Sequence, residues 1–112
     1  MSDVSGSRTN RRLTARHACH FTARYRLGQD WHPATAMDIS LRGCRLRLGE
    51  DLARGSTVTV ALETPRAADG RTLEVEVGGS VIWSRREGLS HQVGIHFSDA
   101  PDTLEQILTT VA

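Results

Sequence analysis

CHFTARYRL, residues 19–27, alternates apolar and polar side chains without a break. The apolar members of this stretch are Cys19, Phe21, Ala23, Tyr25 and Leu27. Successive side chains of a β-strand point to opposite faces, so a period of two predicts a strand with one face buried. The stretch therefore indicates a fold built on half-buried strands.

The same alternation returns downstream, between groups of turn residues. Further strands are predicted over residues 31–39, 44–48, 58–62, 73–83 and 93–97. Pro33 has no backbone donor, so it should lie at the start of its strand or on an edge. Gly78 and Gly79 interrupt the fifth strand and predict a bulge or a sharp bend. Asp69 and Gly70 predict a hairpin between the fourth and fifth strands.

After residue 97 the period changes to that of a helix. Its apolar stripe consists of Leu104, Ile107, Leu108 and Val111, and Pro101 and Asp102 mark its start. A helix of about ten residues is marginal alone, so it should pack on the sheet. Short strands with regular turns and one terminal helix predict an all-β fold, a six-stranded antiparallel β-barrel with a C-terminal α-helix.

Length and composition indicate a single domain. The chain has 112 residues, and domains typically need about 100 to 150 residues to form one core. Residues 1–10, MSDVSGSRTN, are too polar to bury surface that would offset the entropy of ordering them. We therefore expect a flexible tail over residues 1–10 and a domain over residues 11–112.

Charge and hydropathy exclude several classes of function. The formal net charge is only +1, whereas proteins that bind nucleic acid polymers carry a marked basic excess. No stretch approaches the roughly 18 consecutive apolar residues of a membrane span, and the N-terminus lacks the apolar core of a signal peptide. We expect a cytoplasmic protein that neither inserts into a membrane nor binds a nucleic acid polymer.

The reactive side chains do not form a recognisable catalytic or metal site. In the cytoplasm Cys19 and Cys44 should be reduced, and both occupy alternating strand positions. His17, Cys19 and His20 stand too close along one strand to point toward a single zinc ion. No local spacing suggests a Ser-His-Asp triad, and no phosphate-loop glycine signature is present. The sequence thus predicts neither an enzyme nor a bound cofactor.

Two short motifs carry the chemistry of the chain. All 14 basic residues are arginine, and residues 12–16 read RLTAR just before the first strand. Residues 38–43 read DISLRG, at the predicted turn between the second and third strands. An arginine fork binds phosphate or the guanine O6/N7 edge bidentately, and a carboxylate complements the guanine N1–H and N2–H donors.

Both motifs, in this order on a six-strand pattern, resemble those of the PilZ family, small bacterial β-barrels that bind the dinucleotide cyclic di-GMP. The resemblance covers about residues 11–97 and includes VGIHF, residues 93–97, which is similar to the last strand of the family. It implies a ligand site made of Arg11, Arg12, Arg16, Asp38, Ser40 and Gly43.

The residues of this site have expected roles and simpler alternatives. Asp38 would read a guanine edge and Ser40 would donate a hydrogen bond, or both would only stabilise the turn. Gly43 would allow close approach, with a positive φ. Arg11 would contact a stacked ligand dimer or remain a solvated charge. Trp83 has the parity of the core and is expected to pack there, with base stacking as a second possibility.

The resemblance implies a cyclic di-GMP receptor without an output domain, which would signal by a ligand-induced change of conformation to a downstream protein partner. His91 and His96 are expected on the surface, without catalytic roles. The alternative is a PilZ-like adaptor that acts by protein–protein interaction in pilus or flagellar machinery. A small nucleic-acid-binding barrel fits less well because an exposed aromatic platform is missing.

Overall fold

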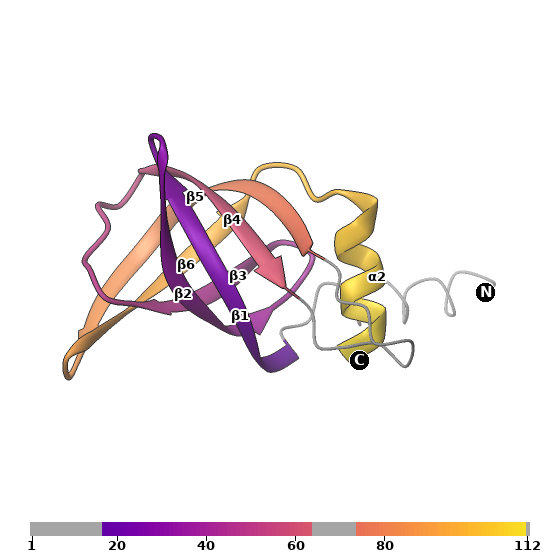
Figure 1. Cartoon of the computed structure of the whole chain (residues 1–112), viewed down its shortest axis with the longest axis horizontal. Helices are drawn as coiled ribbons and strands as arrows, with labels where there is room; N and C mark the ends of the chain where they lie inside the picture. The colour runs from indigo at the N-terminus through magenta and orange to yellow at the C-terminus, as the bar shows by residue number, and fades with distance from the viewer. Residues whose placement is uncertain (1–16, 64–73, 112) are drawn as a thin grey trace, which may run out of the picture.

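The computed structural model describes residues 17–63 and 74–111, which form a closed antiparallel barrel followed by one helix (Figure 1). The strands are β1 (His17–Leu27), β2 (Asp30–Ile39), β3 (Gly43–Leu48), β4 (Thr57–Glu63), β5 (Glu74–Glu87) and β6 (Ser90–Phe97), and the helix is α2 (Asp102–Val111). Around the barrel the strands follow the order β1-β2-β3-β6-β5-β4. The predicted six-stranded fold is confirmed. The tail over residues 1–10 and the hairpin at Asp69 and Gly70 lie outside the described residues.

The core is made by alternate side chains of every strand, as the period of two predicts. Its least exposed large side chains are Tyr25, Ile39, Leu46, Leu62, Ile95, Leu104 and Leu108. Leu104 and Leu108 belong to α2 and are 0% exposed, so the helix packs on the barrel as expected. That helix is not long and apolar enough to cross a membrane, and it is the one helix in the described part of the chain.

Pro33 lies where its missing donor costs little. It pairs with Arg24 of β1, whereas the pairing of β2 with β3 begins only at Thr35. Pro33 therefore has one unpaired side, which confirms its predicted place on an edge.

The glycine pair of β5 does not form the predicted bulge. Gly78 and Gly79 pair in register with β4, and the register shift between β5 and β6 lies further along, between Val81 and Trp83. A Cβ on Gly79 would lie 2.5 Å from the carbonyl oxygen of His96. Gly79 is thus required for the close approach of two strands, and Ile82 is the extra residue of the bulge.

Candidate functional site

The turn between β2 and β3 is closed by Ser40. Its backbone N–H donates to the carbonyl of Gly43 at 2.8 Å, and its Oγ accepts from the N–H of Arg42 at 3.2 Å. The Ser40 hydroxyl also lies 3.4 Å from the Gly43 carbonyl, and the residue is only 3% exposed. The Ser40 side chain therefore stabilises the turn, which corresponds to the simpler of its two expected roles.

Gly43 is needed for a close contact between β3 and β6. A Cβ at this position would lie 2.1 Å from the carbonyl oxygen of Ile95. Its φ is not among the positive values, which among the described glycines occur at Gly28, Gly55 and Gly88. The close approach that requires a glycine here is to the neighbouring strand, the close approach of a ligand to Gly43 stays a prediction, and the expected positive φ is wrong.

A bulge in β2 turns Asp38 to the outer face of the barrel. Ala36 pairs with Leu46 and Asp38 pairs with the adjacent Arg45, so Met37 is an extra residue in β2. Without it, Asp38 would have the parity of Ala36, which is 0% exposed and faces the core. The bulge brings the Asp38 carboxylate beside Arg45, whose Nε lies 2.9 Å from Oδ2.

A second bulge moves Trp83 out of the core. Val81 is 1% exposed and faces inward, the extra residue Ile82 is 41% exposed, and Trp83 pairs with Gly94. A Cβ on Gly94 would lie 2.2 Å from Nε1 of Trp83, so the indole lies across the outer side of this glycine. The expectation that Trp83 packs in the core is wrong, because parity along one strand does not reveal a bulge.

The two bulges place Asp38 and Trp83 in one row of paired residues that crosses four strands. Asp38 pairs with Arg45, Arg45 with Gly94, and Gly94 with Trp83. Directly paired residues point to the same face of a sheet, so Asp38, Arg45 and Trp83 share one outer surface. We call Asp38, Arg45, Gly94 and Trp83 the outer row. Sequence reasoning assigned no binding role to Arg45 or Gly94, although a glycine opposite a tryptophan signals an aromatic ring lying on backbone.

The chain enters the barrel next to this row. Arg11, Arg12 and Arg16 of the predicted site lie outside the described residues. The first described residue, His17, pairs with Ile39, and Ala18 pairs with Asp38. The arginine-rich segment therefore joins the barrel beside one end of the outer row.

Trp83 also borders an open groove. Its volume is about 380 Å³, and it lies between residues 51–54 and the bulge of β5, with Leu52, Ile82 and Ser84 in its walls. Trp83 is only half-buried here. An indole with backbone on one side and open space beside it offers a platform for a flat ring.

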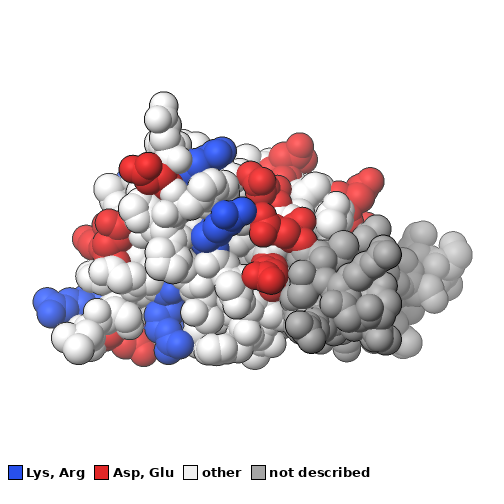
Figure 2. Space-filling view, viewed as in Figure 1, with Lys and Arg blue, Asp and Glu red and all other residues white. Residues whose placement is uncertain are grey.

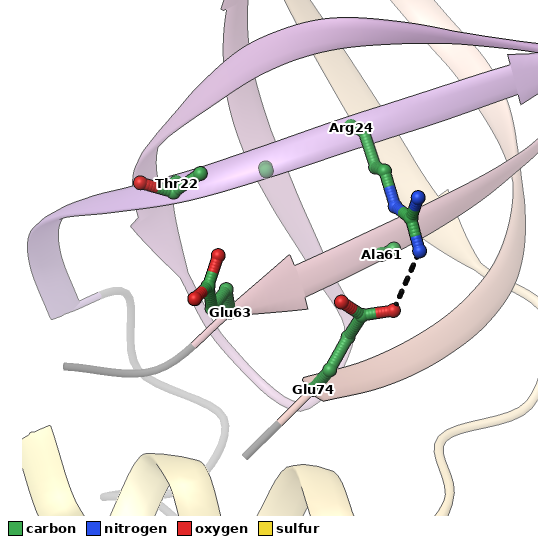
Figure 3. A pocket seen from close by; sticks show the side chains of 6 residues that line it. Thr22, Arg24, Ala61, Glu63 and Glu74 are labelled. Carbon is green, nitrogen blue, oxygen red and sulfur yellow. Dashed lines mark hydrogen bonds and ion pairs between the residues drawn. The ribbon is translucent and has the colours of Figure 1, made fainter. Parts of the chain in front are cut away.

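A second cavity lies on the β1 and β4 side and is unsuited to anions. Figure 3 shows the carboxylates of Glu63 and Glu74 around it and the ion pair of Arg24 with Glu74, at 2.8 Å. Its volume is about 40 Å³. Figure 2 shows acidic side chains gathered on this side of the molecule, where Glu63, Glu74 and Glu76 are exposed. A negatively charged ligand would be repelled by these carboxylates.

The cysteines and histidines considered in the sequence are not members of the outer row. Cys19 and Cys44 are free, and burial raises the pKa of the Cys19 thiol to about 11. His96 is exposed, and His91 is partly buried beside Arg86. Within residues 17–63 and 74–111, no three His, Cys, Asp or Glu side chains are grouped so that they could hold a metal ion.

Comparison with known proteins places the chain among related folds. A model of the PilZ domain matches residues 10–111. No match is found among curated protein sequences.

Three solved structures are similar to the barrel. The Bacillus subtilis inhibitor of motility MotI/DgrA has a TM-score of 0.73 and 13% identity, over 86% of this chain and 47% of that one. The Borreliella burgdorferi protein PlzA, solved in complex with cyclic di-GMP, has a TM-score of 0.59 and 11% identity, over 99% of this chain and 54% of PlzA. A tetrameric PilZ protein from Xanthomonas campestris has a TM-score of 0.51 and 22% identity, over 70% of this chain and 41% of that one. The chain thus spans about half the length of these structures.

Proposed function

This chain belongs to the PilZ domain family, and from this membership we propose that it is a receptor for cyclic di-GMP. The observation that carries the proposal is the outer row, in which two bulges bring Asp38 and Trp83 onto one surface with Arg45 between them. PlzA, which shares the fold, was solved with this ligand bound. No catalytic role is proposed for any residue.

Asp38 is proposed to read the guanine edge. Its side chain is 13% exposed, and Arg45 contacts Oδ2 at 2.9 Å. This ion pair orients the carboxylate. A carboxylate accepts several hydrogen bonds, so it can hold Arg45 and the N1–H and N2–H donors of guanine together.

Trp83 is proposed to stack on a guanine base. One side of the indole covers Gly94 and cannot be reached, whereas the adjoining groove leaves room beside the ring. Stacking of a base on an aromatic side chain contributes about 1–3 kcal/mol. The base held by Trp83 would lie in the same row as the one read by Asp38.

Arg11, Arg12 and Arg16 are proposed to hold the phosphates. Extended chain covers about 3.3–3.6 Å per residue, so the arginines within six residues of His17 can reach the outer row. Ser40 and Gly43 contribute indirectly in this proposal, because they fix the turn that carries Asp38. Ligand binding would order the arginine segment over the barrel and create a surface that a downstream protein reads.

Calorimetric titration with cyclic di-GMP tests the proposal, with cyclic di-AMP as the matched control. Adenine presents no N1–H donor to Asp38, so only the guanine dinucleotide should bind tightly. A ratio of two nucleotides per chain would support the contact assigned to Arg11. Absence of binding would reject the receptor and favour the adaptor that acts through protein contacts alone.

A further inference from the structure

Gln92 connects two arginines on the outer face of the barrel. Its Oε1 accepts a hydrogen bond from Nη1 of Arg45 at 3.2 Å and another from Nη2 of Arg85 at 3.1 Å. Arg45 comes from β3 and Arg85 from β5, the two neighbours of β6. Gln92 itself is only 7% exposed, so the oxygen that receives both guanidinium groups is held by the barrel wall.

This arrangement keeps two like charges close together. Since both donor nitrogens lie within about 3 Å of one oxygen, they are at most about 6 Å apart. Like charges at this distance repel one another, and a neutral amide does not cancel either charge. A glutamate at position 92 would satisfy the same two donors and cancel one of their two positive charges, so the amide preserves positive charge at this point.

The nearby carboxylates offset only part of this charge. Asp38 pairs with Arg45 at 2.9 Å. Glu87 lies 3.6 Å from Arg85, but both side chains are more than half exposed, which makes this pair weak. Arg47 of β3 lies opposite Gln92 in the strand register, so its exposed side chain adds a third guanidinium to the same face. The surface around Gln92 therefore carries an excess of positive charge.

Arg85 also lies close to Trp83, the proposed stacking residue. Its Cζ lies 5.8 Å from the centre of the Trp83 ring. In a nucleotide the phosphate follows the base by one sugar, so a base on Trp83 would bring its phosphate close to Arg85. Two arginine forks facing one point suit the oxygens of a phosphodiester.

We propose that Arg45 and Arg85, positioned by Gln92, form a phosphodiester-binding site on the barrel itself. This inference rests on the proposed function and deepens it, because it assigns one ligand phosphate to the barrel wall in addition to the arginines before β1. In this site Arg85 adds a phosphate contact to those proposed above, and Gln92 is a positioning residue that holds both guanidinium groups.

The structure offers a matched control in the next residue of β5. Arg86 carries the same charge, but it pairs with His91 and points to the opposite face from Arg85. Its Nε donates to the carbonyl of Gly88 within its own turn. Replacing Arg86 by glutamine therefore removes one positive charge from β5 without touching the proposed site.

The test is calorimetric titration of cyclic di-GMP into the parent chain, Arg85→Gln and Arg86→Gln at low and high sodium chloride. Loss of a charged hydrogen bond predicts at least about ten-fold weaker binding by Arg85→Gln, and little change by Arg86→Gln. Added salt should weaken binding by the parent more than binding by Arg85→Gln, since screening acts on the lost charge. Equal affinity of the two variants would overturn the phosphate site while leaving the receptor intact.

Gln92→Glu tests the positioning residue separately. It keeps an acceptor of the same shape for both arginines but cancels one of their two positive charges, so the melting temperature should be maintained while cyclic di-GMP binding weakens and its salt dependence falls. Gln92→Glu with parental affinity and salt dependence would contradict the role of the amide. A parent chain that does not bind cyclic di-GMP at all would reject both this inference and the proposed function.

Discussion

Replacing Gly94 by alanine should remove Trp83 from the ligand surface while preserving the barrel. A Cβ at this position would meet three indole atoms at 2.2, 2.4 and 2.8 Å, whereas carbon atoms in contact are separated by about 3.5–4.0 Å. The ring must therefore move by more than 1 Å, roughly the difference between these distances. Because Trp83 lies on the outer face and borders a groove, it can rotate outward instead of forcing the strands apart.

The magnitude follows from the stacking that would be lost. A base on an aromatic ring contributes about 1–3 kcal/mol, which corresponds to roughly 5- to 150-fold in affinity. Calorimetry of Gly94→Ala with cyclic di-GMP should show a loss in this range. Fluorescence in a Trp31→Phe background, where Trp83 is the one remaining tryptophan of two, should show an indole more exposed to water.

Gly49→Ala is the matched control, since a Cβ there has no atom within 4 Å and the residue is not among the described glycines with positive φ. It should bind and melt like the parent. If Gly94→Ala displaces the indole but retains parental affinity, Trp83 has no part in ligand binding. Unchanged fluorescence would mean that the indole does not lie on Gly94.

Three further predictions test the turn, the guanine contact and the buried thiol. Gly43→Ala should lower the free energy of unfolding in urea by about 1–3 kcal/mol, because its Cβ would lie 2.1 Å from a backbone oxygen that cannot rotate away. A urea midpoint equal to that of the parent would contradict this contact. Asp38→Asn should narrow the calorimetric preference for cyclic di-GMP over cyclic di-AMP, because the amide that replaces the carboxylate accepts fewer hydrogen bonds from guanine. An unchanged preference in Asp38→Asn would remove Asp38 from base recognition. Burial raises the pKa of Cys19 to about 11, above its unfolded value, so its contribution to stability is complete below about pH 8.5 and is lost as pH rises through 11. The parent should therefore lose more stability between pH 8 and pH 10.5 than Cys19→Ser, and equal losses would show that this thiol does not titrate with unfolding.

The barrel could be predicted from the sequence because burial imposes a period of two on each strand. Phe21, Ala23 and Tyr25 face inward as their alternation indicates, and Leu104 and Leu108 pack as the helical stripe indicates. These patterns are local, so each can be read from a few consecutive residues. The same local pattern also predicted the turn between the second and third strands, which the structure has at residues 40–42.

The outer row could not be predicted in the same way, because its geometry depends on pairing between distant strands. Trp83 has the parity of Val81 in the sequence, and only the register of β5 against β6 shows the extra residue between them. Asp38 was identified by its motif, although its parity with Ala36 would place it in the core. Gln92 gave no signal, since its partners Arg45 and Arg85 lie on two other strands.

The bulges explain how one set of strands can serve both stability and binding. Ala36 and Val81 are almost completely buried, yet Asp38 and Trp83, each two residues further along the same strand, face outward. Regular alternation would have put each of these two functional residues on the face of the core, where a charged carboxylate is costly to bury. The extra residue in each strand reverses the alternation, so that the side chain after it points outward instead of inward. In β2 the residue that follows, Ile39, then points into the core again. The proposed ligand surface thus lies on strands whose inner sides remain packed, so the side chains of the outer row can be replaced without opening a cavity in the barrel.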